Sequence, residues 1–234
     1  MRASLQRRIV AEFCGTLFLL AAVVGSGVMA ERLAGGNMAI ALLANTIATG
    51  AALVALILAF GPVSGAHLNP AVTLADAWQG GITRREAAAY ILAQRVGAFA
   101  GVVAGHLMFG LALLSASTHE RSGAAQLFSE FVATFGLSSV IWGCVRQRPS
   151  AVPYAVGRYI AAAFWFTAST SFANPAVTIA RSATNTFAGI RPMDVVGFIG
   201  AQLAGAFAAT FLFQWLTPLL KERPTSDLVE QDQR

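Results

Sequence analysis

Two asparagines in this chain stand where their side chains could act on a passing solute. Each begins the same tripeptide, at Asn69-Pro70-Ala71 and Asn174-Pro175-Ala176, and each tripeptide is followed by Val-Thr. Asn is a good helix N-cap because its side-chain oxygen accepts an N–H of the first turn, and Pro suits the next position because its φ is already helical. Each tripeptide therefore predicts a helix start whose Asn keeps its amide hydrogens for another partner.

Both helix starts lie in strongly apolar sequence. Of the 234 residues, 56% are hydrophobic and 12% are charged, and the mean hydropathy is +0.63. This is too apolar for an ordinary soluble domain, so the composition predicts an integral membrane protein in contact with the lipid bilayer. The formal net charge of +5 comes from basic residues scattered in ones and twos, without the stripe that nucleic acid would need. Cys14 and Cys144 both lie in apolar sequence and indicate no disulfide framework.

Six apolar stretches are long enough to cross a hydrocarbon core of about 30 Å at about 1.5 Å per residue. They are approximately residues 9–29, 39–61, 87–114, 125–145, 152–172 and 195–216. The segments that begin at the two tripeptides, 69–79 and 174–187, would be roughly 15–20 Å long as helices and reach only about halfway. They are predicted to be re-entrant half-helices, whose free backbone groups must face protein or a water-filled path.

Positively charged residues assign the two sides of the membrane. One side receives Arg2, Arg7, Arg8, Arg84, Arg85, Arg146, Arg148, Lys221 and Arg223, and the other receives Arg32, Arg121 and Arg191. The richer side is predicted to be cytoplasmic. A multi-pass protein with an even number of crossings then has both termini in the cytoplasm, and in a bacterium it would lie in the inner membrane.

The chain is a tandem duplication. Three ordered matches pair residues 11–16 with 129–134, 69–71 with 174–176, and 93–100 with 201–208. Because each half has three crossings, the second copy must enter the membrane with inverted topology, and the two half-helices then meet near the midplane by their N-termini. Two positive helix ends and two amide groups at that point would repel cations and donate hydrogen bonds to neutral solutes.

The segments that lead to the two tripeptides have no helical periodicity. They can present backbone carbonyls to the same path, forming a ladder of hydrogen-bond acceptors. The carbonyls expected to line it belong to Gly65, Ala66, His67, Phe172 and Ala173.

With these features the chain resembles the aquaporins of the major intrinsic protein family. The resemblance covers about residues 9–216 and includes the doubled tripeptide, Ser64-Gly65-Ala66-His67 before the first copy, and the Glu-x-x-x-Thr sequence that opens each repeat. It implies an all-α membrane protein with six transmembrane helices and two re-entrant half-helices, a pore through each protomer, and a homotetramer. The single channel domain would cover residues 1–220, with repeats at about 9–114 and 125–216, followed by a polar tail at 221–234.

Glu12 and Glu130 are ionisable residues at membrane depth, which marks them as functional candidates. The resemblance implies a scaffold role, in which each carboxylate accepts hydrogen bonds from the backbone of a re-entrant loop; direct contact with the solute is the alternative. No metal cluster, cofactor motif or nucleophile–base pair is recognisable, so no cofactor or metal and no enzymatic activity are expected.

The departure from the family lies at the selectivity filter. Most members place an Arg directly after the second tripeptide, and this chain has Val177 there. By spacing, the other filter positions are Thr49 in the second span, Ser171 before Asn174, and one residue of the fifth span. Counting from Gly157 gives Phe164 for that residue, whereas counting back from Asn174 gives Ala162.

Arg181 lies four residues after Val177, on the same helical face and one turn nearer the outer surface. It could partly replace the missing charge in an outer vestibule, or it could extend to the headgroups or to a loop carbonyl. Asp76 occupies the matching place in the first half-helix.

These features predict a passive channel for small uncharged solutes. By resemblance to metalloid-permeable aquaglyceroporins, the solutes would be glycerol-like polyols, arsenite and other neutral metalloid species, together with water. A water-selective aquaporin is the first alternative. An ion-coupled secondary transporter is the second, since such proteins also use inverted repeats and broken helices, but no carboxylate stands next to either tripeptide.

Overall fold

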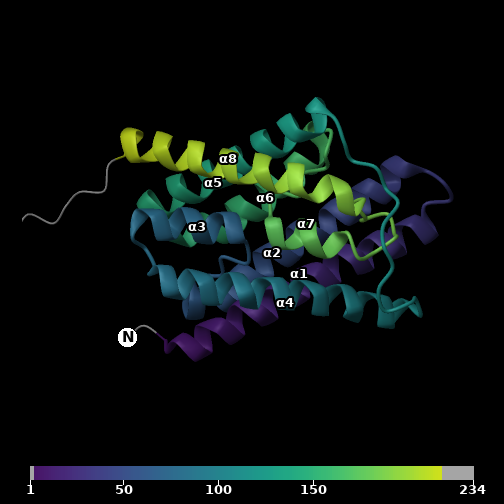
Figure 1. Ribbon diagram of the computed structural model, residues 1–234, viewed down its shortest axis with the longest axis horizontal. Helices are drawn as coiled ribbons and strands as arrows, with labels where there is room; N and C mark the ends of the chain where they lie inside the picture. The colour runs from purple at the N-terminus through teal and green to yellow at the C-terminus, as the bar shows by residue number, and fades with distance from the viewer. Residues whose placement is uncertain (1–2, 218–234) are drawn as a thin grey trace, which may run out of the picture.

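The computed structural model describes residues 3–217, and helices are the only regular elements in that range (Figure 1). The long helices there are α1 (Leu5–Leu33), α2 (Met38–Ser64), α4 (Arg84–Phe109), α5 (Ala124–Gln147), α6 (Val152–Phe166) and α8 (Val195–Leu216). The short ones are α3 (Pro70–Gln79) and α7 (Pro175–Arg181), with 3-10 turns η1 (Pro149–Ala151) and η2 (Pro192–Asp194). The predicted tail at 221–234 lies outside the described residues.

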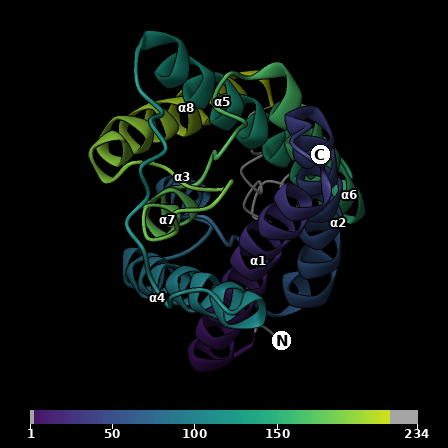
Figure 2. The same ribbon diagram turned by 90° about the vertical axis from the view of Figure 1, so that its right-hand side faces the viewer.

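The long helices surround the two short ones. Figure 1 shows α3 and α7 in the middle of the bundle, α3 toward one end and α7 toward the other, and Figure 2 shows both enclosed by the long helices. The start of α1 and the end of α8 lie at the same end of the bundle. That end also carries the loops predicted to be cytoplasmic, and we call it the inner end; the opposite end is the outer end.

Three predicted segments end earlier than hydropathy indicated. The third span, expected to reach residue 114, ends at Phe109, because Gly110 caps it in a left-handed conformation (φ 66°). The fifth span, expected at 152–172, ends at Phe166, and the second half-helix, expected to reach 187, ends at Arg181. Residues 167–173 form a turn and an irregular loop that enters the protein interior at Phe172 and Ala173, and hydropathy averaged over a long window does not mark where the helix ends.

Five of the described helices are long and apolar enough to cross a membrane, namely α1, α2, α4, α5 and the segment Pro192–Leu216 that contains α8. Helix α6 has 15 residues and falls below the length that this criterion needs. It is preceded directly by η1, and it packs between α2 and α5 as one of the surrounding helices.

Small residues allow the helices of each repeat to approach closely. A Cβ at Gly97 of α4 would collide with the carbonyl oxygen of Phe13 in α1, and a Cβ at Gly205 of α8 would collide with that of Phe131 in α5. These contacts are equivalent in the two repeats. Interfaces built on small residues are typical of helices that associate within a bilayer.

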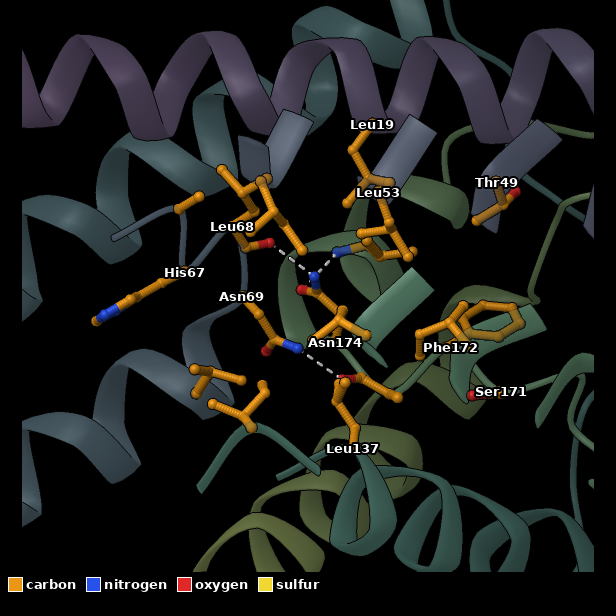
Figure 3. A pocket seen from close by; sticks show the side chains of 18 of the residues that line it. Leu19, Thr49, Leu53, His67, Leu68, Asn69, Leu137, Ser171, Phe172 and Asn174 are labelled. Atoms are coloured by element: carbon orange, nitrogen blue, oxygen red, sulfur yellow. Dashed lines mark hydrogen bonds between the residues drawn. The ribbon is translucent and has the colours of Figure 1, made fainter. Parts of the chain in front are cut away.

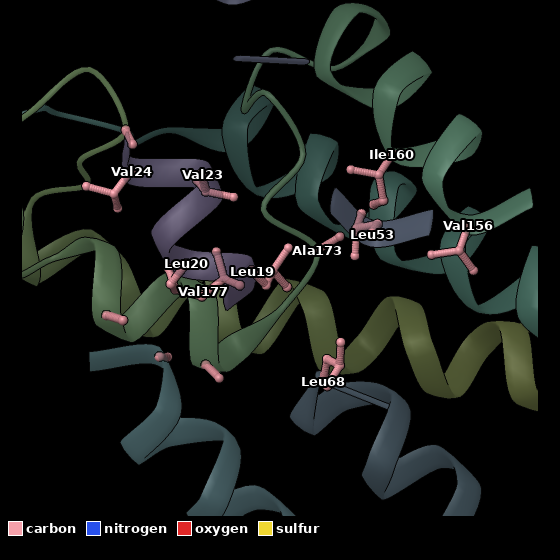
Figure 4. Packing of buried hydrophobic residues seen from close by; sticks show 14 of the residues in the cluster. Leu19, Leu20, Val23, Val24, Leu53, Leu68, Val156, Ile160, Ala173 and Val177 are labelled. Carbon is pink, nitrogen blue, oxygen red and sulfur yellow. The ribbon is translucent and has the colours of Figure 1, made fainter. Parts of the chain in front are cut away.

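The buried core joins the helices to the two loops that precede the half-helices (Figure 4). Leu68 and Ala173, one from each loop, are 2% and 0% exposed and belong to the same hydrophobic cluster as Leu19 of α1 and Ile160 of α6. Large apolar side chains also cover the outside of the bundle, for example Phe18, Leu92 and Val196. Such an apolar exterior suits contact with lipid or with other membrane helices.

Candidate functional site

Each half-helix begins at its predicted asparagine. The Oδ1 atom of Asn69 accepts a hydrogen bond from Ala71 N at 2.9 Å, and Oδ1 of Asn174 accepts from Ala176 N at 3.0 Å and from Val177 N at 3.3 Å. Both asparagines have extended backbone angles and are followed by Pro at the first helical position. The local sequence therefore forms the helix starts that the cap rules predict.

The asparagine side chains also link the two repeats. Asn69 Nδ2 donates to the carbonyl oxygen of Ala173 at 2.7 Å, and Asn174 Nδ2 donates to that of Leu68 at 2.7 Å (Figure 3). One hydrogen of each amide is thus used across the interface, and one remains for a solute. The sequence predicted helix caps with free amides. It contained no signal for these two reciprocal hydrogen bonds between the loops.

The two loops repeat the same backbone conformation. Ala66 and Leu68 have φ values of 46° and 49°, and Ser171 and Ala173 have φ values of 50° and 49°. Left-handed angles at residues other than Gly cost of order 1–3 kcal/mol each and persist only where the surroundings fix them. The loops therefore need strong anchors.

Glu12 is the anchor of the first loop. Its carboxylate is fully buried and accepts hydrogen bonds from His67 N (3.0 Å), Leu68 N (2.7 Å), the Ser64 hydroxyl (2.6 Å) and Gln94 Nε2 (2.8 Å). Because all four donors belong to the protein, the carboxylate has the surroundings of a scaffold group.

Glu130 has the same arrangement in the second loop. It accepts hydrogen bonds from Phe172 N (2.8 Å), Ala173 N (2.9 Å) and Gln202 Nε2 (2.6 Å). Gln202 also donates to the Thr178 hydroxyl at 2.8 Å, as Gln94 does to Thr73 at 3.0 Å. No role was predicted for these glutamines, although they lie inside the repeated segments 93–100 and 201–208.

A cavity of about 290 Å³ passes both asparagines and is lined mostly by apolar side chains. In Figure 3, His67 lies on one side of the asparagine pair, and Thr49, Ser171 and Phe172 lie on the other. The predicted filter residues that line this cavity are Thr49, Phe164, Ser171 and Val177. Ala162, the alternative in the fifth span, is exposed and does not line it.

Two hydroxyl groups in the outer half of the cavity have no hydrogen-bond partner among the described residues. They are Thr49 Oγ1 and Ser171 Oγ, on side chains of residues that are 3% and 2% exposed. A buried polar group without a partner costs roughly 1–3 kcal/mol, so such groups need a functional reason. A solute in the cavity would supply the missing partner.

The inner end of the cavity is lined by His67 and Asp76. His67 Nε2 lies 3.7 Å from a carboxylate oxygen of Asp76, and His67 Nδ1 lies 3.2 Å from the Thr73 hydroxyl. The predicted carbonyl residues Gly65, Ala66 and His67, and Phe172 and Ala173, all line the cavity as well.

Arg181 lines the outer end of the cavity. The residue is 3% exposed, its Nε donates to the Ala188 carbonyl oxygen, and its guanidinium carbon lies 3.4 Å from the centroid of the Phe172 ring. A bond to a loop carbonyl was one of the two predicted roles. The cation–π contact with Phe172 was not predicted, because the two residues lie in different segments.

Arg121 also approaches this region from the loop between α4 and α5. Its guanidinium donates to the carbonyl oxygens of Gly189 (2.8 Å) and Ser169 (3.1 Å), and its backbone N donates to Asp194. Burial lowers the pKa of Arg121 from its usual value, although an arginine remains charged in proteins. From the sequence, Arg121 was predicted only to lie on the outer side of the membrane.

Within residues 3–217, no group of three or more His, Cys, Asp or Glu side chains is placed to hold a metal ion.

Comparison with known proteins gives a consistent assignment. The family model described as Major intrinsic protein matches residues 1–162. Aquaglyceroporin AqpS of Rhizobium meliloti (strain 1021) is 58% identical over 212 residues, which cover 91% of this chain and 91% of that protein. Aquaporin A of Dictyostelium discoideum is 32% identical over 236 residues, which cover 94% of this chain and 80% of that protein.

The X-ray structure of the aquaglyceroporin from Plasmodium falciparum has a similar fold. It matches with a TM-score of 0.72 at 19% identity, over 92% of this chain and 98% of that one. At this identity the likeness bears on the fold alone. It confirms the prediction of an all-α bundle with two half-helices.

The fold and the doubled helix starts thus define a membrane channel with an inverted repeat. The chain belongs to the major intrinsic protein family. As a member of a channel family it is not an enzyme, as the sequence predicted.

Proposed function

We propose that this protein is a passive channel for small uncharged solutes, with glycerol-like polyols, arsenite and other neutral metalloid species, and water as its permeants. The observation that carries the proposal is the cavity that passes both capping asparagines and is lined by Val177 where most family members have Arg. A Val side chain is short and apolar, whereas Arg would project a long cation with several donors into the same space.

Thr49, Phe164, Ser171 and Val177 form the outer constriction in this proposal. Two of these residues are apolar and two carry unpartnered hydroxyls. A polyol can place its carbon skeleton against the apolar walls and its hydroxyls against Thr49 and Ser171, which offsets the loss of water. The name of the relative AqpS, an aquaglyceroporin, is consistent with this solute class.

The remaining parts of the site have supporting roles. The asparagine amides donate to the solute at the midplane, and the carbonyls of Gly65, Ala66, His67, Phe172 and Ala173 accept from it. Glu12 and Glu130 act as scaffold carboxylates, which their complete sets of protein donors support.

The assembly and its orientation complete the proposal. The channel unit covers residues 1–220 and forms a homotetramer, with each protomer holding its own pore. Both termini are cytoplasmic, and in a bacterium the membrane is the inner membrane. The common end of α1 and α8 and the excess of arginines at that end support this orientation.

The test is a swelling assay on proteoliposomes that contain the purified protein, with inward gradients of glycerol, urea, arsenite or a methylated arsenic acid, and with water flow measured separately. We expect glycerol and arsenite to enter much faster than in protein-free vesicles, without saturation and without any ion gradient. A water-selective aquaporin would pass water and exclude glycerol. A coupled transporter would saturate and would require its ion, so either result would overturn the proposal.

A further inference from the structure

The guanidinium of Arg181 has donors that the protein does not use. Its Nε donates to the Ala188 carbonyl oxygen, but among residues 3–217 no hydrogen bond reaches Nη1 or Nη2. No carboxylate oxygen lies within 4 Å of it in the same range, since the ion pairs found there involve other residues. A residue that is 3% exposed and lines the solute cavity therefore carries an unpaired positive charge.

This charge is held in place by an aromatic ring that is itself fixed by its neighbours. The Phe172 ring lies 3.4 Å from the guanidinium carbon, and the ring itself packs edge-on against Phe198 with a centroid separation of 5.3 Å. The Phe172 backbone is fixed in turn by its hydrogen bond to Glu130. A guanidinium stacked on an aromatic ring in this way is pre-organised, so that binding a ligand costs little side-chain entropy.

A second positive charge approaches the same ring. The guanidinium carbon of Arg121 lies 5.0 Å from the Phe172 centroid, and its Nε and Nη1 donate to loop carbonyls. The buried carboxylate behind the loop, Glu130, accepts hydrogen bonds from two backbone N–H groups and from Gln202. The outer end of the cavity thus has two cations near one ring, and Arg181 has no acceptor for its free amino groups.

Two further groups in the outer half of the cavity can donate to a ligand. Ser171 Oγ and Thr49 Oγ1 belong to residues more than nine-tenths buried and have no partner in the described part of the chain. A ligand rich in acceptor oxygens would therefore satisfy a planar guanidinium and also hydroxyl donors.

We propose that the outer end of the cavity is a binding site for small, singly charged oxyanions, with Arg181 as the residue that recognises them. The two free amino groups of Arg181 match two oxygens of one anion, and the Ser171 and Thr49 hydroxyls provide additional donors along the cavity. An anion bound there obstructs the path of neutral solutes. This inference rests on the proposed channel, because the site lies in the proposed solute pathway.

The inner end of the same cavity offers no such site. There the equivalent position in the repeat is Asp76, seven residues after Asn69 as Arg181 is seven after Asn174, and its carboxylate lies 3.7 Å from His67. The two ends of the pathway therefore differ in the sign of their charge, and only the outer end attracts an anion. External anions should act and internal anions should not.

The test uses intact spheroplasts that express the protein, because all copies then present the same end to the medium. Glycerol entry is followed by light scattering with methanesulfonate outside, compared with sucrose of equal osmolarity and with chloride of equal ionic strength. Methanesulfonate remains singly charged at neutral pH and has three acceptor oxygens. We expect it to slow glycerol entry at least twofold in a saturable way, and chloride to do so much less.

Two variants assign the effect to Arg181. Arg181→Gln should abolish the slowing, and Arg181→Lys, which keeps the charge but loses the planar pair of donors, should weaken methanesulfonate binding by about tenfold. Arg32→Gln is the matched control, because Arg32 is exposed at the outer end of α1 and donates to the Phe109 carbonyl outside the cavity. It should retain the full slowing.

Each outcome decides one claim. Glycerol entry that is rapid but insensitive to methanesulfonate, or equally sensitive in Arg181→Gln, would overturn the oxyanion site while the proposed channel stands. Equal slowing by chloride would overturn the assignment to oxyanions. Absence of glycerol entry would overturn the proposed solute range, and the site would then be read from water flow and from the thermal midpoint of the purified protein. Methanesulfonate should raise that midpoint in the wild type and not in Arg181→Gln.

Discussion

The inner and outer halves of the pathway are built on one plan and carry different charges. In both halves a buried glutamate holds the loop, a glutamine bonds that glutamate and a threonine hydroxyl of the half-helix, and an asparagine caps the half-helix. The half-helices then diverge at equivalent positions. The inner half has Asp76 beside His67, and the outer half has Arg181 stacked on Phe172.

This comparison separates two demands on the duplicated sequence. The groups that hold the loops in strained left-handed conformations are the same in both copies, because both copies need equivalent anchors. The groups that line the cavity about two turns from the midplane, Asp76 and Arg181, differ, because they meet the solute at different ends. Selectivity can therefore vary without any change in the scaffold.

Loss of a scaffold carboxylate should have the largest effect. Glu12→Ala and Glu130→Ala each leave two backbone N–H donors unpaired in a buried loop, at about 1–3 kcal/mol for each donor. We expect a fall in the yield of the proposed tetramer and a thermal midpoint lower by about 5 °C or more, measured on the purified protein. Glu12→Ala should be the more severe, because Glu12 accepts from two further side chains and Glu130 from one.

The control for this comparison is Glu31→Ala, since Glu31 is exposed near the outer end of α1. It should leave the thermal midpoint unchanged. Normal stability of Glu130→Ala together with an altered choice of solutes would contradict the scaffold role and would favour direct contact of the carboxylate with the solute.

Replacement of the capping asparagines should change ion exclusion. In Asn174→Asp a carboxylate oxygen would replace the amide that donates to the Leu68 carbonyl, and in Asn69→Asp the Ala173 carbonyl would lose its donor. An ionised Asp also attracts cations at the midplane. We expect cation leakage through proteoliposomes to rise by at least about tenfold, the change that about 1.4 kcal/mol produces.

The two variants should behave alike, because the two hydrogen bonds that link the loops are equivalent. Unchanged ion and solute permeability in a correctly inserted Asn174→Asp protein would contradict the placement of this side chain at the pore. A large effect at only one of the two positions would contradict the symmetry.

Much of the fold followed from local rules. The helix starts at Asn69 and Asn174 were predictable because capping depends only on adjacent residues, and the inverted repeat was predictable because three crossings per half leave no other arrangement. The ends of α6 and α7 were predicted wrongly. Residues 167–173 directly continue an apolar helix, but they form a turn and an irregular loop, and a hydropathy window does not mark that change.

Contacts between distant segments were harder to predict. The links from Asn69 to Ala173 and from Arg181 to Phe172 join separate segments of the fold, and no periodicity within a segment indicates them. Gln94 and Gln202 were detectable in principle, because a polar residue repeated at the same place in two apolar spans needs a buried partner. The filter residue Phe164 could be chosen over Ala162 only after the fifth helix was placed.

Changing Val177 should alter the outer half selectively. Val177→Arg would put a second cation one helical turn from Arg181, where like charges repel, and would narrow the cavity. We expect entry of arsenite and of methylated arsenic solutes to fall by about tenfold, a loss typical of steric exclusion in an apolar site, and water flow to fall much less. The assay is proteoliposome swelling at constant protein amount.

Val177→Met distinguishes bulk from charge, since Met is larger than Val but uncharged. It should reduce the flow of large solutes without adding hydrogen-bond donors, and so should fall between the wild type and Val177→Arg. Equal loss of all permeants in Val177→Arg, or no loss, would place the constriction elsewhere, at Phe164 or Arg181.

The smallest effect is expected at the inner end. Asp76→Asn removes the carboxylate that lies 3.7 Å from His67, but the imidazole keeps its contact with the Thr73 hydroxyl at 3.2 Å. The 3.7 Å separation between the His67 ring and the Asp76 carboxylate is too long for a hydrogen bond, so this contact contributes little. Glycerol and water flow should therefore change by less than about threefold.

Slowing by external methanesulfonate should persist in Asp76→Asn, because the oxyanion site is assigned to the outer end. A loss of that slowing in Asp76→Asn, measured in the same spheroplast assay, would show that the two ends of the cavity act as one electrostatic unit and would remove the contrast drawn between them.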